Sequence, residues 1–431
     1  MTLKKMITYA SFGILVCAPI EGFASNIIAQ DIKESHESSN ARTPADLSPQ
    51  PVQWGSFLLY PSLNLQGEYQ SNIFYQNTGE KTDFIWTTRP AIDIEKSIRD
   101  HKFSLKTDIV DRRYLGNSDE STQDYNIEFK SNVVVTSSLK IPTQISFSDK
   151  ALSRSAPGSI RFTTNPVYSK NFNARSGLSY RFNRVNLSLI GNYDRLTYED
   201  STSKLNGRQV VFSNKDRSIH GATLLAAYDI MGNQAEGAEY TLFAGLSYQR
   251  EKFDDFVAAG VNTAPLRSNH QKRVLVGIKT THKNLLIGEI GGGYYHYDYD
   301  STLAAPIENF DIYADLKYLI TPKLTLSAMA ERSINQDNDF SRGFEQTDYA
   351  LGAEYEFLHN FYGTLQGTYS FDEFIGSNRE DDTHGISAGI RYLHSPKFES
   401  RVRALYETQN STQIGGGYDQ NIFTYSLVGR L

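Results

Sequence analysis

Two long stretches of alternating side chains between Gly55 and Glu95 constrain the fold more than any other feature of the sequence. In the first, Leu63 and Tyr69 share a parity that alternates with polar residues. In the second, Phe84 and Trp86 begin a similar series. Successive side chains of a strand point to opposite faces, so each stretch has one apolar and one polar face. The alternation continues for about a dozen residues, roughly twice the usual strand length and close to the ~9–11 residues that cross a bilayer at a tilt.

The same pattern recurs to the end of the chain and predicts about 18 strands. Two of them, near 218–230 and 286–297, are irregular because both parities carry apolar residues. The strands after the first two are expected near residues 102–115, 123–136, 139–148, 168–182, 185–198, 218–230, 238–251, 271–282, 286–297, 309–319, 324–335, 345–357, 361–372, 383–393, 400–409 and 419–431.

The connecting segments alternate between short links and longer polar loops. This rhythm, with an even number of strands, is typical of bacterial outer-membrane barrels. A β-propeller would have shorter strands without the rhythm, and a β-solenoid would have a tighter repeat. We therefore predict an all-β fold over residues 55–431. It is a transmembrane antiparallel up-and-down β-barrel with short periplasmic turns and longer extracellular loops.

The overall composition is compatible with such a barrel. A hydrophobic content of 39% and a mean hydropathy of −0.45 exclude a bundle of membrane helices. They do not exclude a barrel, in which only alternate residues meet lipid. The chain has 27 Tyr, a residue suited to membrane–water boundaries. From composition alone, an ordinary Tyr-rich β-protein would be the preferred interpretation.

The N-terminus resembles a secretory signal peptide over residues 1–24. Lys4 and Lys5 form a positive region, an apolar run follows to Ile20, and small residues precede the cut near Ala24. A lipoprotein attached at Cys17 is an alternative, but a bulky valine precedes that cysteine. Residues 25–54 are polar and irregular, which predicts a flexible periplasmic segment, with a lumen plug as the alternative.

The face opposite the apolar one carries charges of both signs, which indicates a wet lumen, because charge on the lipid face costs about 2–4 kcal/mol at the midplane. Mixed signs predict weak ion selectivity. The alternative is the solvated outer face of a soluble sheet. The predicted pore-lining residues are Glu68, Arg89, Asp93, Lys106, Asp108, Arg112, Glu128, Lys130, Arg175, Arg181, Asp315, Lys317, Glu331, Glu354, Glu356, Arg391, Arg403 and Glu407.

Motifs for covalent chemistry, cofactors and metals are absent from the sequence, so we expect no enzyme, no cofactor and no metal site. His296, His384 and the pair Asp381 and Asp382 lie near predicted strand ends, where solvated loop residues are the simpler interpretation than a hydrolase site. The net charge is −6 and no basic patch stands out, so nucleic acid is not an expected partner.

The final strand carries Phe423, Tyr425, Leu427 and Leu431 on one parity and ends with the chain. Such an ending resembles the signal recognised by the outer-membrane barrel assembly machinery. That signal usually ends in Phe or Trp, so Leu431 departs from it. We expect the assembly machinery and outer-membrane lipid as partners.

Several short motifs resemble the β-barrel porin type 2 family of bacterial outer membranes. They are Gly55-Ser-Phe-Leu-Leu-Tyr-Pro61, Glu68-Tyr-Gln-Ser-Asn72-Ile-Phe74, Asp83-Phe-Ile with Pro90, and Leu319-Ile-Thr-Pro-Lys-Leu324. The resemblance covers about Gly55 to Leu431 and implies an outer-membrane pore. Members are often associated with polysaccharide export, which implies periplasmic export components as partners and an exopolysaccharide, or a similar polar polymer or solute, as cargo.

Three hypotheses follow, in order of preference. The first is a passive, water-filled pore, either a conduit for an exopolysaccharide or a general diffusion porin for small polar solutes. The second is a non-conducting barrel that anchors a periplasmic complex through residues 25–54. The third is an outer-membrane hydrolase that depends on His296 or His384.

Overall fold

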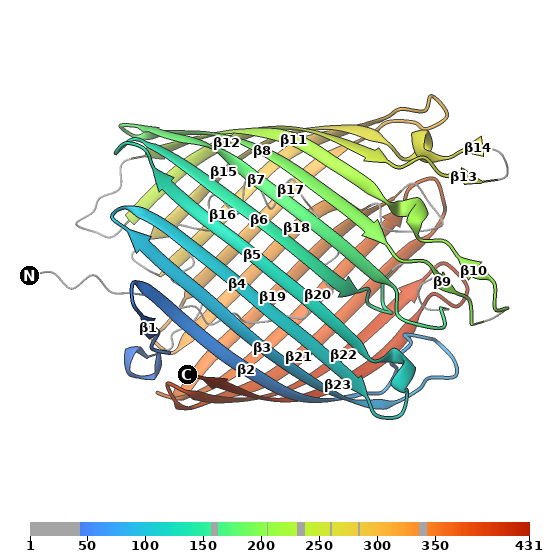
Figure 1. Cartoon of the computed structure of the whole chain (residues 1–431), viewed down its shortest axis with the longest axis horizontal. Coiled ribbons are helices and arrows are strands. Elements are labelled where there is room, and N and C mark those ends of the chain that lie inside the picture. The colour runs from blue at the N-terminus through green and yellow to red at the C-terminus, as the bar shows by residue number, and fades with distance from the viewer. Residues whose placement is uncertain are drawn as a thin grey trace, which may run out of the picture.

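The computed structural model describes residues 44–156, 163–204, 206–230, 238–258, 261–282, 285–335 and 343–431. These residues form a closed antiparallel barrel of 18 wall strands, which slant across the cylinder in Figure 1. The wall strands are β2 (Phe57–Gln70), β3 (Asp83–Ile98), β4 (His101–Tyr114), β5 (Thr122–Val134), β6 (Leu139–Ala151), β7 (Tyr168–Phe182), β8 (Val185–Tyr198), β11 (Arg217–Ile230), β12 (Ala238–Phe253), β15 (Asn269–His282), β16 (Leu286–Tyr299), β17 (Ile307–Leu319), β18 (Leu324–Asn335), β19 (Phe344–Leu358), β20 (Phe361–Phe374), β21 (Glu380–Ser395), β22 (Phe398–Ser411) and β23 (Tyr418–Arg430).

Short strands and 3-10 turns lie at both ends of the cylinder. A short strand, β1 (Val52–Trp54), pairs with the start of β2 at the end with the short turns. The long-loop end carries the hairpins β9 (Ser201–Thr202) with β10 (Gln209–Val210) and β13 (Val257–Ala258) with β14 (Val261–Asn262). The 3-10 turns are η2 (Ala45–Leu47), η3 (Ser118–Glu120), η5 (Ser213–Lys215) and η7 (Ala264–Leu266).

Each wall strand pairs with its neighbours in sequence order, and the barrel closes where β23 meets β2. The backbone bonds from Leu431 N to Pro61 O (3.2 Å) and from Ser71 N to Asn421 O (3.0 Å) flank this closing ladder. Two ladders are interrupted at prolines, β3–β4 at Pro90 and β6–β7 at Pro142. Proline has no N–H to donate, so a central strand can carry it only where a ladder bond is given up.

The register divides the wall into two faces. The outward face carries a band of exposed apolar and aromatic side chains, among them Leu63, Trp86, Leu246, Leu351 and Phe423. Their cross-strand partners share the same face, as pleating requires. The alternate residues of every strand therefore point to the inside of the cylinder.

The predicted strands are confirmed, including the two irregular ones, which are β11 and β16. The irregularity of β11 has a physical cause on the inner face. Leu225, Phe243 and Leu275 form a buried apolar cluster there, so β11 is apolar on both faces. A Cβ at Gly277 would lie 2.3 Å from the Phe243 ring, so glycine provides the room for that ring.

Some predicted boundaries differ from the structure. The loop expected at 373–382 is reduced to residues 375–379, because β20 and β21 continue to Phe374 and from Glu380. Asp381 and Asp382 therefore belong to a strand, not to a loop. The predicted signal peptide, residues 1–24, lies outside the described residues. Of the segment 25–54, only residues from 44 onward are described, and these include η2 and β1.

We predict that arginine is tolerated very differently on the two faces of β19. Leu351 lies at the middle of the strand, points outward and is 68% exposed, whereas Ala350 points inward. Leu351→Arg should destabilise the barrel in lipid vesicles by about 2–4 kcal/mol, the cost of a cation on the lipid face near the midplane. Ala350→Arg serves as the matched control and should cost clearly less. The measurement is urea unfolding; the reverse order would mean that the faces are inverted.

Candidate pore lining and mouth of the barrel

The structure places all the charged residues predicted to line a pore on the inner face of the sheet. They are opposite in parity to the exposed apolar band on each strand. This holds for Glu68, Arg89, Asp93, Lys106, Asp108, Arg112, Glu128, Lys130, Arg175, Arg181, Asp315, Lys317, Glu331, Glu354, Glu356, Arg391, Arg403 and Glu407.

On β3 to β6 these charges are brought together into pairs. Arg89 Nε lies 3.1 Å from Asp108, and Arg112 Nη1 lies 2.5 Å from the buried Asp124. Lys130 approaches Glu128 at 3.5 Å. The first two pairs join adjacent strands, whereas Lys130 and Glu128 both lie on β5. Pairing stabilises the wall without burying an uncompensated ion. The lining on this side is therefore charged but nearly neutral.

Next to the closing seam, Glu68 receives bonds from the amides of Gln66 (3.0 Å) and Gln70 (2.6 Å). On β22, Glu407 accepts a bond from the Tyr418 hydroxyl (2.8 Å). Arg391 lies over the Tyr362 ring, 4.4 Å from its centroid. The predicted residues on this side are thus held by aromatic and amide neighbours as well as by ions.

Arg175 and Arg181 are not drawn into one site. Arg175 lies at mid-height beside Gln144 and Asn192, its cross-strand neighbours. Arg181 pairs with Asp229 at 2.5 Å near the short turns, where both side chains are exposed. The two arginines therefore occupy different levels of the wall.

Sequence reasoning missed several ion pairs on the inner face. Arg217 and Glu251 pair at 2.7 Å with only 3% of each side chain exposed, and Arg273 pairs with Asp311. Glu399, 1% exposed, receives Arg401 and, at 2.7 Å, Arg430. Parity assigns such residues to the inner face, but Arg217 and Glu399 lie just outside the predicted strands, and parity alone does not show which charges pair.

The inner charge is unevenly distributed around the cylinder. From β16 to β21 acidic side chains outnumber basic ones, which an inspection of single strands does not reveal. The inward acids on this arc are Glu289, Asp311, Asp315, Glu331, Asp348, Glu354, Glu356, Asp372 and Asp381, whereas the inward bases are Lys317 and Arg391.

Loops at the long-loop end are tied together by a buried ion cluster. Glu120 of η3 receives Arg154 Nε at 2.9 Å and Lys204 Nζ at 3.0 Å; Glu120 and Arg154 are 5% and 7% exposed. Lys204 Nζ also lies 3.8 Å from the ring centroid of Phe74. Four loops, those following β2, β4, β6 and β8, thus meet at one point over the mouth.

An apolar core accompanies these ions. Phe212, fully buried, packs with Val167, Leu196, Tyr198 and Ile219. The loops following β6 and β8 therefore pack onto the strand ends through an apolar core, whereas the sequence predicted only longer polar loops. The loop after β6 contributes three apolar residues and the loop after β8 two, so no single loop shows the core in sequence.

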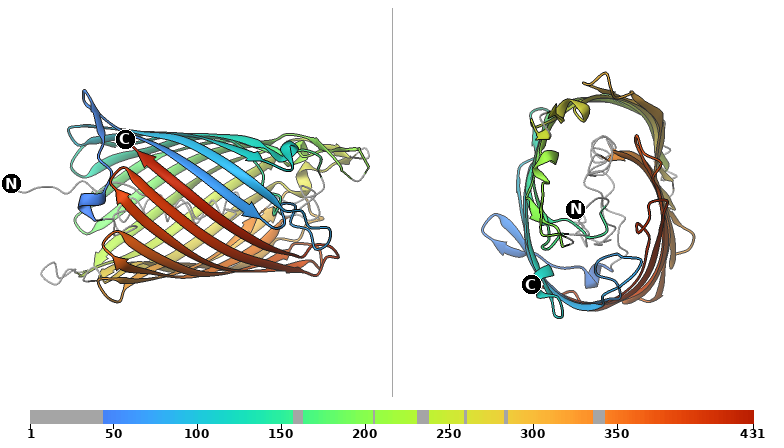
Figure 2. Two further views of the ribbon diagram at one scale, coloured as in Figure 1. Left: turned by 90° about the horizontal axis from the view of Figure 1, so that it is seen from below. Right: turned by 90° about the vertical axis from the view of Figure 1, so that its right-hand side faces the viewer.

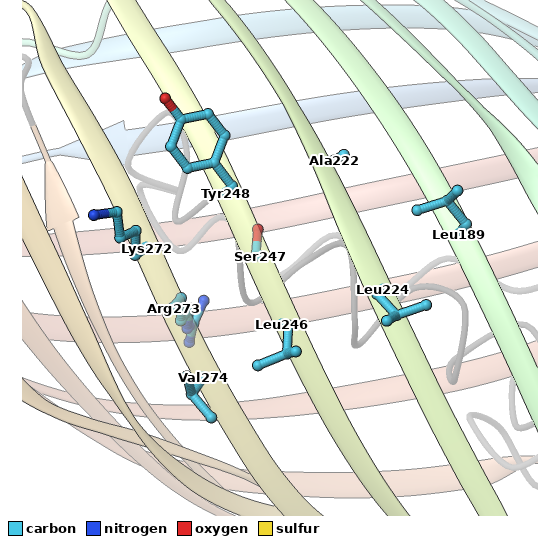
Figure 3. Close-up of a pocket in the computed structure, with 9 residues that line it drawn as sticks. All are labelled: Leu189, Ala222, Leu224, Leu246, Ser247, Tyr248, Lys272, Arg273 and Val274. Atoms are coloured by element: carbon cyan, nitrogen blue, oxygen red, sulfur yellow. The ribbon is translucent and has the colours of Figure 1, made fainter.

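A depression of about 280 Å³ lies between β8, β11, β12 and β15. Figure 3 shows Leu189, Leu224, Leu246 and Val274 projecting from the sheet around Ala222. These side chains belong to the outward band, and the depression is a dent where a small side chain stands among larger ones. It is therefore no part of the lining.

The histidines considered for a hydrolase site lie on the outward face. His296 Nδ1 is 2.7 Å from Glu308, and the His384 ring lies 4.9 Å from that of Tyr369. Across the residues that the structure describes, no group of metal-ligating side chains gathers and no helix is long and apolar enough to span a membrane.

Asp254, in the loop after β12, has a lowered pKa because the Arg195 guanidinium donates two hydrogen bonds to it.

We predict that Glu120→Gln loosens the mouth. Breaking a buried ion pair costs about 3–5 kcal/mol, because the remaining cations lose their compensation. Trypsin should then cleave after Arg154 and Lys204 in the inserted barrel faster than in the wild type. Glu199→Gln is the control: its pair with Lys170 (2.9 Å) is exposed and of little energetic value. Equal cleavage in all three proteins would show that the cluster does not hold the loops.

Comparison with solved structures returns outer-membrane barrels. OpdL of Pseudomonas aeruginosa is 13% identical, with 88% of this chain and 100% of that chain covered and a TM-score of 0.45. A BenF-like porin from Pseudomonas fluorescens Pf-5 is 10% identical, with coverages of 86% and 99% and a TM-score of 0.44. The ferric citrate transporter FecA is 9% identical with a TM-score of 0.46; 85% of this chain is covered, but only 61% of that chain.

Among curated proteins, none matches the chain. The family model described as "Putative beta-barrel porin 2" matches residues 45–431, which include every wall strand from β2 to β23. The match therefore extends over all of the residues that form the barrel. The chain belongs to this family of porin-like outer-membrane barrels.

Proposed function

We propose that the protein is a passive, water-filled pore of the outer membrane that passes a polar polymer, an exopolysaccharide or a similar solute. The observation that carries the proposal is the inner face, which is charged and hydrogen-bonded over most strands while the opposite face is apolar. A barrel of 16–18 strands is wide enough for an aqueous channel. Export of the polymer would involve periplasmic components that deliver it to the short-turn end.

The inner face also suits sugars. Tyr114, Tyr295, Tyr313, Tyr362 and Tyr418 point inward among carboxylates and amides. Four of these rings, those of Tyr295, Tyr313, Tyr362 and Tyr418, are at most 6% exposed. A sugar would therefore meet the surrounding carboxylates and amides, which can hydrogen-bond its hydroxyls. No covalent step is assigned to any residue, and the protein is proposed to act without enzymatic activity or a cofactor.

A second candidate is a barrel that anchors a periplasmic complex through residues 25–54. The specific observation is the contact between Asp46 and His359 Nε2 at 3.0 Å, together with the pairing of β1 with β2. These contacts fix the end of the segment beside a short turn. Deleting residues 25–50, which leaves β1 and β2 in place, should abolish capture of a periplasmic partner without preventing insertion if this function is correct.

We predict that the refolded protein conducts in planar bilayers and discriminates weakly between ions. The lining carries both signs, and the acidic arc from β16 to β21 should give a modest preference for cations. The reversal potential in a KCl gradient measures this preference. Lysine substitution of both Glu354 and Glu356 should shift it toward anions, whereas Glu199→Lys, in an exposed pair at the mouth, is the control. A protein that never conducts would contradict the pore.

The cargo is tested separately in cells. Deletion of the gene should reduce surface glycan, and the wild-type protein should restore it. Normal glycan on the deletion strain, together with an open channel in bilayers, would leave a general diffusion porin for small polar solutes.

A further inference from the structure

The wall is not continuous around the whole long-loop end. β17 and β18 pair from Tyr313–Glu331 to Leu319–Thr325, and the ladder stops there although both strands continue. Extending the register would place Ile312 opposite Arg332 and Phe310 opposite Ile334, and none of these described residues pair. On its other side β18 stays paired with β19 as far as Asn335 and Phe344. β19 in turn stays paired with β20 up to Phe344 and Phe374, so the wall separates between β17 and β18, and β18 forms the edge of the sheet on one side of the gap.

The side chains show on which side of β17 the end of β18 and β19 lies. On β18 and β19, Ile334, Glu345 and Thr347 have the parity of Tyr349 and Leu351, which are 42% and 68% exposed on the outward face. Yet Ile334, Glu345 and Thr347 are only 7%, 6% and 5% exposed. The same face of the sheet thus changes from exposed to buried within two residues along β19.

What covers this face is the inside of the neighbouring wall. The Glu345 carboxylate accepts bonds from Asn309 Nδ2 (3.0 and 2.8 Å) and from the Tyr295 hydroxyl, and both donors belong to the inner face of β16 and β17. Arg332 Nε is 3.3 Å from Glu345 and donates to Thr347 Oγ1 at 3.0 Å. The outward face of β18–β19 therefore lies against the inward face of β16–β17.

The end-on view in Figure 2 agrees with this arrangement, since the orange end of the β18–β19 pair lies inside the ring of strands. Sheets packed face to face are about 10 Å apart, so this end occupies about that much of the lumen on one side. We call Arg332–Asn335 together with Phe344–Thr347 the tucked end.

We infer that the tucked end is the constriction of the pore, and that Glu345 is the positioning residue that holds it against the inner wall. The inference rests on the proposed pore function. Asn309, Tyr295 and Arg332 satisfy the buried carboxylate of Glu345, which is what allows a charge to stay there. Without that carboxylate the donors of the inner wall lose their shared acceptor, and the tucked end is released toward the gap beside β17.

Single-channel recording tests the inference. Glu345→Ala and Asn309→Ala should each raise the conductance and allow larger polyethylene glycols to enter, because both remove the same contact from opposite sides. For that reason their effects should not add in the double variant. Tyr295→Phe, which removes one hydroxyl, should change the conductance in the same direction by less.

Glu308→Gln is the matched control, because it removes a carboxylate from the outward face of β17, next in sequence to Asn309, where it does not face the lumen. It should leave the polymer exclusion limit at the wild-type value. Wild-type conductance in Glu345→Ala and Asn309→Ala would overturn the constriction while the pore itself stood. Absence of conductance in the wild type but not in Glu345→Ala would support the inference, with the tucked end closing the channel. Absence in both would overturn the pore and, with it, the constriction.

Discussion

The need to pair backbone N–H and C=O groups within the membrane is the constraint on which this structure depends. Lipid offers no hydrogen bonds, so a strand can cross it only as part of a closed sheet. Here closure is made by strands at the two ends of the chain, β2 and β23, through residues Ser62–Gln70 and Ile422–Arg430. The rest follows from closure, because a cylinder separates one face of every strand from lipid.

Because one face of every strand is separated from lipid, the chain can carry many charged residues on that face. On the inner face they are compensated by neighbours on adjacent strands, as in Arg112 with Asp124 and Arg217 with Glu251. A buried charge that lacks such a neighbour would be expensive, and pairing reduces that cost. Each pair forms only in one register of its two strands, so the pairs also fix the positions of the charges along the lining.

The interior is more differentiated than a uniform polar tube. The apolar cluster of Leu225, Phe243 and Leu275 lies on one side, and an acid-rich arc occupies β16 to β21. At the mouth, Glu120 collects cations from two loops, and Phe212 anchors an apolar core beneath them. Passage through the proposed pore would thus be shaped by the loops at the mouth and by the tucked end of β18–β19.

The alternation of side chains was sufficient to determine the number of strands, their order and the face on which residues such as Glu68, Lys106 and Glu407 lie. It succeeds because strand parity and short turns are local properties. It could not place Glu345, whose parity assigns it to the outward face. That residue is buried inside because the sheet bends there and meets Tyr295, 50 residues away in the chain. The face of the sheet on which a side chain lies is determined by the residues of its own strand. The surface that this face contacts is determined only when distant strands pack together.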